Sequence, residues 1–211
     1  MILIGMFDSP FVRRVAVSLR LLGHDYEHRN WSVGKDFDRI REYNPLGRVP
    51  AFVLDDGEVL TESGAILDHL DQLAGPERAL LPPSGIARRH SLHLIALASG
   101  AAEKGVMQIY ERVFRPEEKV HQPWLDRCYT QMIESLRAID AVCAERVGAP
   151  SLAGERFSQA DITVAIVYTF LSETRSLPAD LLPALHAHTA HCEARPEFVE
   201  THVPFFVPAS N

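Results

Sequence analysis

The sequence predicts an α/β unit with the element order βαβαββα, followed by a unit that contains only helices. In the first part of the chain, short apolar runs alternate with helical patterns, which is typical of strands linked through helices. Further along, the strand signals stop and long helical patterns follow. A segment rich in Gly, Pro and polar residues separates the two parts. We therefore expect a domain at 1–76, a linker at 77–85 and an all-helical domain at 86–211.

The composition is that of an ordinary globular protein, with 211 residues of which 46% are hydrophobic and 23% charged. The net charge of -7 disfavours a nucleic-acid partner, and the pairs Arg13–Arg14 and Arg88–Arg89 are interpreted as solvated helix faces. No run approaches the ~20 apolar residues of a membrane span, and the first residues lack the basic segment of a signal peptide. These features predict a cytoplasmic protein without a membrane partner.

The three cysteines, Cys128, Cys143 and Cys192, are odd in number and widely spaced. That pattern favours reduced, structural thiols over a disulfide framework.

The chain begins with a strand and a helix. Residues 2–7 form a continuous apolar run, as expected for a strand buried on both faces. Ser9 followed by Pro10 is a helix-start pattern, with serine as the N-cap and proline at the first helical position. Apolar residues then recur at helical spacing as far as Gly23.

The rest of the first domain completes the predicted order. Residues 26–31 fit a strand and 36–43 a short polar helix, so the first two strands are expected to be parallel. Residues 51–54 and 58–61, with an Asp-Gly turn between them, read as a hairpin. Ser63 is the predicted cap of the last helix.

The second domain is predicted from helical periodicity at 86–114, 123–147 and 158–172, with shorter helices at 179–192 and around Glu197.

A capping box opens the third of these helices. Ser158 and Asp161 form the box, with Phe157 and Ile162 placed to form a hydrophobic staple around it. Asp161 is therefore assigned a structural role.

The segment from Asn44 to Phe52 combines a turn with an unusual strand start. Asn44 and Gly47 have the positions expected in a type I turn. Pro50 has no N–H and pushes Val49 into an extended conformation, in which its backbone groups can pair with a short peptide. The alternative interpretation is only a turn and the start of a strand.

Three segments are expected at one end of the predicted sheet: the turn at Ser9, the bend at Val49 and the helix start at Glu62 and Ser63. Ligands of open α/β sheets usually bind at such an end. Ser63 at a helix start suits a carboxylate, and Glu62 suits an ammonium group. The spacing therefore favours a small zwitterionic peptide as ligand.

Taken together, these motifs resemble those of cytosolic glutathione transferases. The match rests on 9–14, 44–50, Glu62–Ser63 and 158–161, and it covers nearly the whole chain. The resemblance implies a thioredoxin-like glutathione-binding domain, a helical domain that completes the electrophile pocket, and glutathione as co-substrate. It further implies a cis peptide bond before Pro50, pairing of Val49 with the cysteinyl backbone, and contacts of Glu62 and Ser63 with the γ-glutamyl end.

Ser9 matches the position of the catalytic hydroxyl in serine-type members, so the chain is identified as a bacterial serine-type member. A serine is no base at neutral pH, and its role would be to donate a hydrogen bond that favours the glutathione thiolate. A free thiol with a pKa near 8.5 is only ~3% ionised at pH 7, so a hydrogen bond that lowers this pKa would increase the fraction of thiolate. The alternative is a plain N-cap. Cysteine-type relatives, which form a mixed disulfide at this position, are a poorer match.

The remaining site residues concern the glycine end of glutathione and the electrophile. Either Arg48 or Lys35 is expected to hold the glycine carboxylate of glutathione, and the alternative is that both are only solvated. The electrophile pocket is expected to include Phe7 and Phe11, which flank Ser9. It is also expected to include Met107, Tyr110 and Phe114, whose helical spacing is equally typical of a core.

Other expectations concern partners and chemistry. The resemblance implies a homodimer and a role in detoxification, and the small residues of 97–102 are compatible with close helix contact. His186, His188, His191 and Cys192 lack a specified fourth convergent ligand, so no metal site is expected. The alternative functions are another glutathione-dependent enzyme (isomerase, dehalogenase or peroxidase) and a non-catalytic interaction protein on the same fold. Zeta-class isomerases carry a Ser-Ser-Cys motif that Asp8–Ser9–Pro10 does not match.

Overall fold

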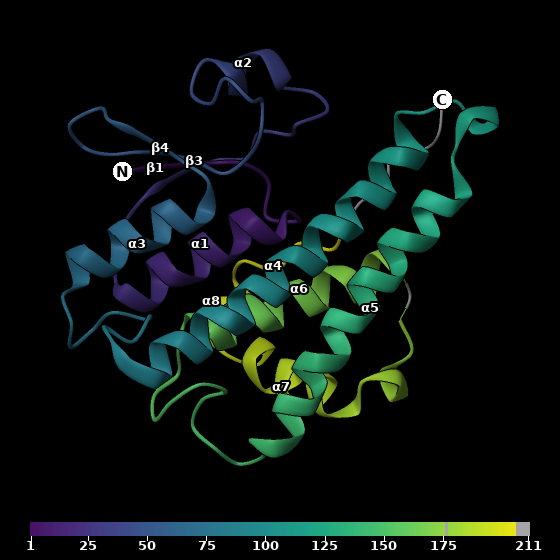
Figure 1. Cartoon of the computed structure of the whole chain (residues 1–211). Coiled ribbons are helices and arrows are strands. Elements are labelled where there is room, and N and C mark those ends of the chain that lie inside the picture. Colours follow the sequence, from purple (N-terminus) through teal and green to yellow (C-terminus); the bar gives the residue numbers. More distant parts are fainter. Residues whose placement is uncertain (176, 206–211) are drawn as a thin grey trace.

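The computed structural model describes residues 1–175 and 177–205 as an α/β unit packed beside a helical unit (Figure 1). The last residues of the predicted helical domain, 206–211, lie outside this description.

The α/β unit has the predicted order of strands and helices. Its elements are β1 (Ile2–Ile4), α1 (Pro10–Leu22), β2 (Glu27–Arg29), α2 (Phe37–Arg41), β3 (Ala51–Val53), β4 (Val59–Thr61) and α3 (Ser63–Ala74). The strand order in the sheet is β2-β1-β3-β4, with β1 parallel to β2 and β3 antiparallel to both of its neighbours. Figure 1 shows α1 and α3 on one face of the sheet and α2 on the other.

The first strand is shorter than predicted, because Gly5 ends it. Gly5 has a φ of 134°, and a Cβ atom there would lie 2.6 Å from Val12 and 2.8 Å from Val49. Only glycine tolerates that backbone conformation and that close approach. Residues 6 and 7 therefore leave the sheet, and the prediction of a strand over 2–7 was wrong at its end.

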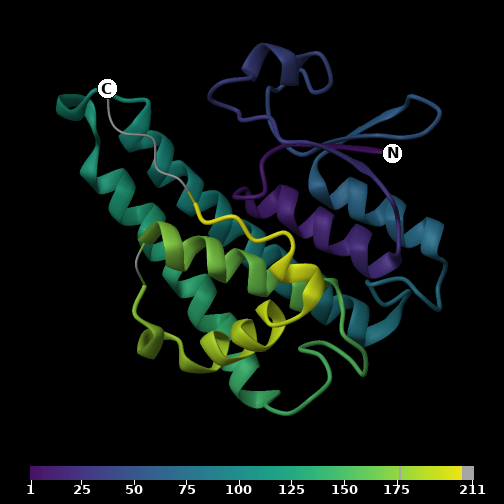
Figure 2. The same ribbon diagram turned by 180° about the vertical axis from the view of Figure 1, so that it is seen from behind.

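The helical unit also follows the predicted order. Its elements are α4 (Gly85–Val113), α5 (Gln122–Glu145), α6 (Gln159–Arg175), α7 (Pro183–Glu193) and α8 (Pro196–Val199), with short 3-10 helices at Glu117–Lys119 and Ala179–Leu181. Figures 1 and 2 show α4 and α5 as a long helical pair, with α6 behind it in Figure 1 and in front of it in Figure 2. Helix α6 contacts α1 as well as α4 and α7, so it joins the two units. No helix in the described part of the chain is long and apolar enough to cross a membrane.

The predicted capping box at the start of α6 is present. Asp161 is fully buried and accepts hydrogen bonds from the Ser158 N–H at 2.9 Å and the Ser158 hydroxyl at 2.7 Å. It also accepts from the Ser151 hydroxyl at 2.6 Å and the Leu152 N–H at 2.9 Å. Four donors on one carboxylate stabilise the loop before α6 as well as the helix start, which confirms a structural role for Asp161.

The three cysteines are buried free thiols, as predicted. Burial raises the pKa of the Cys143 thiol to about 12 and also raises the pKa of Cys192. Protonated thiols in these positions are poor nucleophiles, which agrees with a structural role.

The small residues of α4 make close helix contacts, as expected, but they do so within one chain. Ala98, Ala101 and Ala102 are buried in the core of the helical unit, where they pack with residues of α5 and α6. The small-residue run is therefore explained by packing within one chain and gives no separate support for a dimer.

Candidate functional site

The strand register brings three turns to one edge of the sheet. Ile4 at the end of β1 pairs with Ala51 at the start of β3, and Ala51 pairs with Thr61 at the end of β4. The β1–α1 turn, the bend before β3 and the start of α3 therefore leave the sheet at the same edge. This arrangement matches the site expected from the sequence.

The bend before β3 is held in place by Asn44. The Gly47 N–H donates to the Asn44 carbonyl at 2.8 Å, closing the predicted turn. The Asn44 side chain donates to the Arg48 carbonyl at 2.8 Å and accepts from the Leu46 N–H at 3.1 Å. Sequence reasoning read Asn44 only as a turn former, whereas both ends of its side-chain amide fix the loop.

Val49 presents free backbone groups at this edge. The Val49–Pro50 peptide bond is cis, as expected. Within the described residues, neither the N–H nor the C=O of Val49 forms a hydrogen bond with the rest of the backbone. Because the Val49 side chain lies against the position of Gly5, the missing Cβ of Gly5 is what admits this loop. A glycine at the end of an apolar run is the sequence signal that would have predicted this close approach.

Ser9 is the N-cap of α1, and its side chain makes no capping hydrogen bond. The first turn of α1 contains no acidic residue, so no carboxylate of that turn neutralises the positive end of the helix. Ser9 is half-buried, and the first N–H groups of the helix that it opens have no partner within that helix. A plain capping role therefore does not account for this side chain.

The start of α3 differs from the prediction in its cap. Glu62, not Ser63, is the N-cap, and its carboxylate accepts from the Gly64 N–H at 2.8 Å. Glu62 has a φ of 72°, a conformation that is uncommon outside glycine and concentrates at functional sites. Its side chain remains 69% exposed, so one side of the carboxylate faces solvent.

Arg14 connects this helix start to the helical unit, although the sequence suggested a solvated residue. Its side chain is only 4% exposed, and Nη2 donates to the Ser63 hydroxyl at 2.7 Å. The Ser63 hydroxyl donates in turn to Glu62 at 3.1 Å, and Nη1 of Arg14 donates to Ser99 of α4 at 3.2 Å. Burial lowers the pKa of Arg14 to about 10, while Glu62 acts in the opposite direction.

Arg13 is also buried, contrary to the expectation of a solvated face. Its guanidinium makes two hydrogen bonds to Glu193 of α7, at 2.8 Å and 2.5 Å, and a third to the Phe198 carbonyl. The two neighbouring arginines therefore anchor α1 to the helical unit on two sides. Helical periodicity alone gave no sign of this, because the partners come from distant parts of the chain.

The two residues proposed for the glycine carboxylate have different surroundings. Lys35 is exposed in the segment before α2, and no side-chain contact is described for it. Arg48 follows the Asn44 turn directly, and it is close enough to Tyr110 of α4 to oppose the rise in that phenol's pKa caused by burial. Of the two residues, Arg48 is therefore the one that lies near α4.

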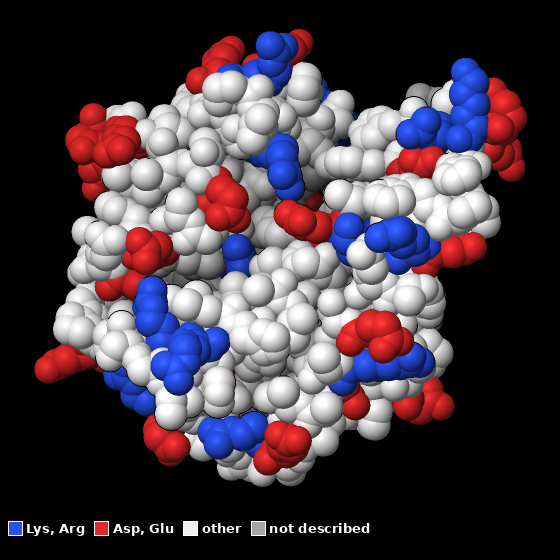
Figure 3. Space-filling model, in the orientation of Figure 1, with Lys and Arg blue, Asp and Glu red and all other residues white. Residues whose placement is uncertain are grey.

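Three of the five predicted pocket residues come together. Met107, Tyr110 and Phe114 line a hollow of about 570 Å³ at the end of α4, which Trp124 of α5 also lines. The rings of Tyr110 and Phe114 meet edge to face, with centroids 5.1 Å apart. The space-filling view shows a depression between the α/β unit and the arm made by the ends of α4 and α5, with charged side chains at its rim (Figure 3).

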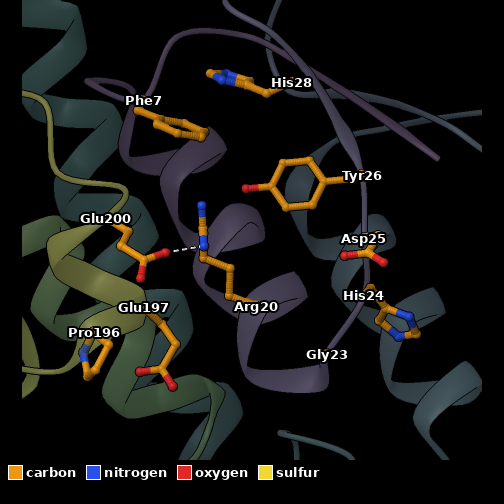
Figure 4. A pocket seen from close by; sticks show the side chains of 10 residues that line it. All are labelled: Phe7, Arg20, Gly23, His24, Asp25, Tyr26, His28, Pro196, Glu197 and Glu200. Atoms are coloured by element: carbon orange, nitrogen blue, oxygen red, sulfur yellow. Dashed lines mark hydrogen bonds and ion pairs between the residues drawn. The ribbon is translucent and has the colours of Figure 1, made fainter.

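The other two predicted pocket residues lie elsewhere. Phe7 stacks on His28 with ring centroids 3.9 Å apart and lines a separate hollow of about 530 Å³, between the C-terminal half of α1 and α8 (Figure 4). Phe11 packs against the core of the helical unit, with the Arg14 guanidinium 6.0 Å from its ring. The five residues thus do not form one pocket, because the β1–α1 turn directs Phe7 toward β2.

Among residues 1–175 and 177–205, no group of three or more His, Cys, Asp or Glu side chains is arranged to hold a metal ion. Cys192 instead lies 3.5 Å from Nε2 of His188.

Comparison with known proteins identifies the same family over both parts of the chain. The model for the glutathione S-transferase N-terminal domain matches residues 3–78, and the model for the C-terminal domain matches residues 104–196. A glutathione transferase family member from Pseudomonas fluorescens Pf-5, crystallised with bound glutathione, superposes with a TM-score of 0.83 at 31% identity, covering 97% of this chain and 99% of that one.

Two further relatives are named for different activities, a transferase and an isomerase. A glutathione S-transferase from Methylobacillus flagellatus, solved with glutathione, has a TM-score of 0.86 at 27% identity and covers 95% of this chain and 98% of its own. The maleylacetoacetate isomerase of Pseudomonas aeruginosa is 26% identical over 205 residues, covering 93% of this chain and 92% of that protein. From the matching domain models and full-length neighbours, together with the edge formed by Ser9, Val49 and Glu62, we conclude that this chain belongs to the glutathione S-transferase family.

Proposed function

We propose that this protein is a glutathione-dependent transferase in which the Ser9 hydroxyl stabilises the glutathione thiolate. The observation that carries the proposal is the uncommitted Ser9 side chain at the N-terminus of α1, on the same edge as the free backbone groups of Val49. Domain 1–76 would hold glutathione, and domain 86–211 would complete the electrophile pocket.

The residues present fit glutathione as a ligand. The exposed side of the Glu62 carboxylate can accept the γ-glutamyl ammonium group, while the N–H and C=O of Val49 can pair with the cysteinyl residue. The Ser63 hydroxyl is already engaged by Arg14 and Glu62, so the γ-glutamyl carboxylate would be held by the free N–H groups of the first turn of α3. Arg48, which adjoins Val49, is the proposed partner of the glycine carboxylate.

The chemistry follows from the position of the thiol. A hydrogen bond from Ser9 and the positive end of α1 both favour the charged sulfur, and lowering the thiol pKa by two units corresponds to about 2.7 kcal/mol. The thiol proton passes to solvent, because Ser9 donates a hydrogen bond and does not take the proton. The thiolate then attacks an electrophilic carbon, forming an S–C bond as the bond to the leaving group breaks with its electron pair.

A second candidate is a glutathione-dependent isomerase, favoured by the near full-length similarity to the maleylacetoacetate isomerase. The same thiolate would add to a carbon–carbon double bond and leave again after rotation, so glutathione would be regenerated. Consumption of glutathione by the wild-type protein separates the two reactions. We also propose a homodimer, on the basis of the family alone.

The test is a pH titration of bound glutathione by ultraviolet difference absorbance. Wild type should show a thiol pKa well below about 8.5, and Ser9→Ala should bind glutathione but lose this shift. Ser84→Ala is a matched control, because Ser84 caps α4 and likewise makes no capping hydrogen bond. An unshifted pKa in wild type, or an unchanged shift in Ser9→Ala, would contradict the assignment, and absence of glutathione binding would favour a non-catalytic role.

A further inference from the structure

The hollow at the end of α4 combines aromatic walls with an excess of positive charge. Tyr110, Phe114 and Trp124 line it, and their side chains are 45%, 67% and 37% exposed, respectively. Three large rings left this accessible around one hollow of about 570 Å³ suit a flat apolar body, since pockets of this size usually bury small ligands against apolar and aromatic walls.

The acidic residue of this hollow is already neutralised. Glu111 is 9% exposed, and its carboxylate accepts from Arg115 Nε at 2.8 Å and from the His121 N–H at 3.2 Å. These two donors lower the pKa of Glu111, so it stays ionised and paired. The Glu111–Arg115 pair therefore contributes little net charge to the hollow.

Lys119 supplies an unbalanced positive charge. Its side chain lines the hollow, and no ion pair with a described residue is found for its ammonium group. The neighbouring Glu117 and Glu118 do not line the hollow. Lys119 is exposed, so its ammonium group is free to approach a negatively charged group of a ligand held among the three rings.

Two further cations make this environment unfavourable for a cationic ligand. The Lys104 ammonium group lies 5.7 Å from the centre of the Trp124 ring, and Arg48 of the α/β unit lies near Tyr110. A ligand cation would meet like charges here, whereas an anion would be attracted from either side.

The hollow is placed to receive the second substrate. Arg14 of α1 contacts Ser99 of α4, and Figure 1 shows the N-terminal end of α1 pointing along α4 toward its C-terminal end. Ser9 lies five residues from Arg14 in that direction, and Met107 begins the hollow eight residues beyond Ser99. A glutathione sulfur at Ser9 would therefore lie on the same side of the Arg14–Ser99 contact as the hollow.

We infer that the electrophile of this enzyme is an aromatic acid, whose ring lies among Tyr110, Phe114 and Trp124 and whose carboxylate pairs with Lys119. This inference rests on the proposed transferase function. The glutathione thiolate would form an S–C bond to the ring, the bond to the leaving group would break with its electron pair, and the carboxylate would remain unchanged.

The test compares two aryl chlorides of similar shape, 4-chloro-3-nitrobenzoate and 4-chloro-3-nitrobenzamide, with each rate divided by its uncatalysed rate. Wild type should favour the acid by about two- to fivefold in kcat/KM, which is the range expected for one exposed ion pair. Lys119→Gln should remove this preference, Lys119→Arg should retain most of it, and Arg89→Gln, which removes an exposed cation at the other end of α4, should leave it unchanged.

The binding of unreactive analogues separates failure of this inference from failure of the proposed function. Isothermal titration calorimetry would compare 3-nitrobenzoate with 3-nitrobenzamide on wild type and Lys119→Gln. Tighter, Lys119-dependent binding of the acid without turnover of either chloride would support the site and contradict the transferase function. Equal kcat/KM values for the two chlorides, or equal Kd values for the two analogues, would overturn the inference whatever reaction the enzyme performs.

Discussion

The Arg14 guanidinium donates a 2.7 Å hydrogen bond to the Ser63 hydroxyl, and that hydroxyl donates to the Glu62 carboxylate. The same guanidinium reaches Ser99 on α4, so one buried cation joins the helical unit to the residues proposed to hold the γ-glutamyl end. Because Arg14 is buried, its contacts are shielded from solvent and orient the start of α3.

Replacing Arg14 should therefore affect binding as well as stability. Arg14→Lys keeps a positive charge, but an ammonium group cannot serve Ser63 and Ser99 with the geometry of a guanidinium. We expect the Kd for glutathione to rise about tenfold and the free energy of unfolding to fall by about 2 kcal/mol. Calorimetric titration and urea unfolding measure the two effects. Ser99→Ala, which removes only one weaker contact, is the control and should change both quantities less.

Glu62 combines a capping role with a proposed binding role, and Glu62→Gln separates them. The glutamine oxygen can still accept from the Gly64 N–H, but the Ser63 hydroxyl loses its acceptor and Arg14 its neighbouring charge, so the free energy of unfolding should fall by about 1 kcal/mol. The lost negative charge should weaken glutathione binding about tenfold, since the ligand ammonium loses its partner. Glu58→Gln, in the exposed hairpin turn, is the matched control. Unchanged affinity for Glu62→Gln would exclude it as the ammonium partner.

Asp161 should matter for folding and not for chemistry. Asp161→Ala would leave four donors without their acceptor, and we expect a loss of about 3 kcal/mol or more in the free energy of unfolding. Asp126→Ala, an exposed aspartate on α5, should cost less than about 1 kcal/mol. Once folded, Asp161→Ala should retain wild-type affinity for glutathione, and a selective loss of that affinity would instead point to a role in the site.

His188 should give the protein a pH-dependent stability. Burial lowers its pKa, while Asp161 at 3.7 Å acts in the opposite direction and His191 adds to the lowering. In the unfolded state the His188 side chain is protonated below about pH 6.5, whereas in the folded state it stays neutral down to its lower pKa. The free energy of unfolding therefore falls as the pH drops below about 6.5, and it levels off below the folded-state pKa.

Urea unfolding from about pH 7.5 to about pH 5 measures this effect. The fall in stability should be smaller in His188→Gln, which lacks the titrating group, than in wild type. His90→Gln, exposed on α4, should follow the wild-type profile. Parallel profiles for wild type and His188→Gln would show that His188 has the same pKa in both states.

Local signals were strong enough to predict most of the elements. Ser9–Pro10 marked the start of α1, and Asp161 marked the capping box of α6. Predictions were wrong where the backbone conformation in the folded chain differs from the one that the residue type suggests. Ser63 looked like the cap of α3, but a positive φ at Glu62 moved the cap back by one residue.

The sequence alone was enough to predict the order of elements, the three motifs at one edge of the sheet and the family resemblance. Each of these depends on helix caps, turns and proline geometry, which are set by residues close together in the chain. The tertiary structure decided which side chains meet. It brought buried Arg14 into contact with Glu62 and Ser99, separated Phe7 from Met107 and placed Lys104 over the Trp124 ring. These contacts join residues far apart in the chain, and they depend on how whole helices pack, which no local pattern of residues encodes.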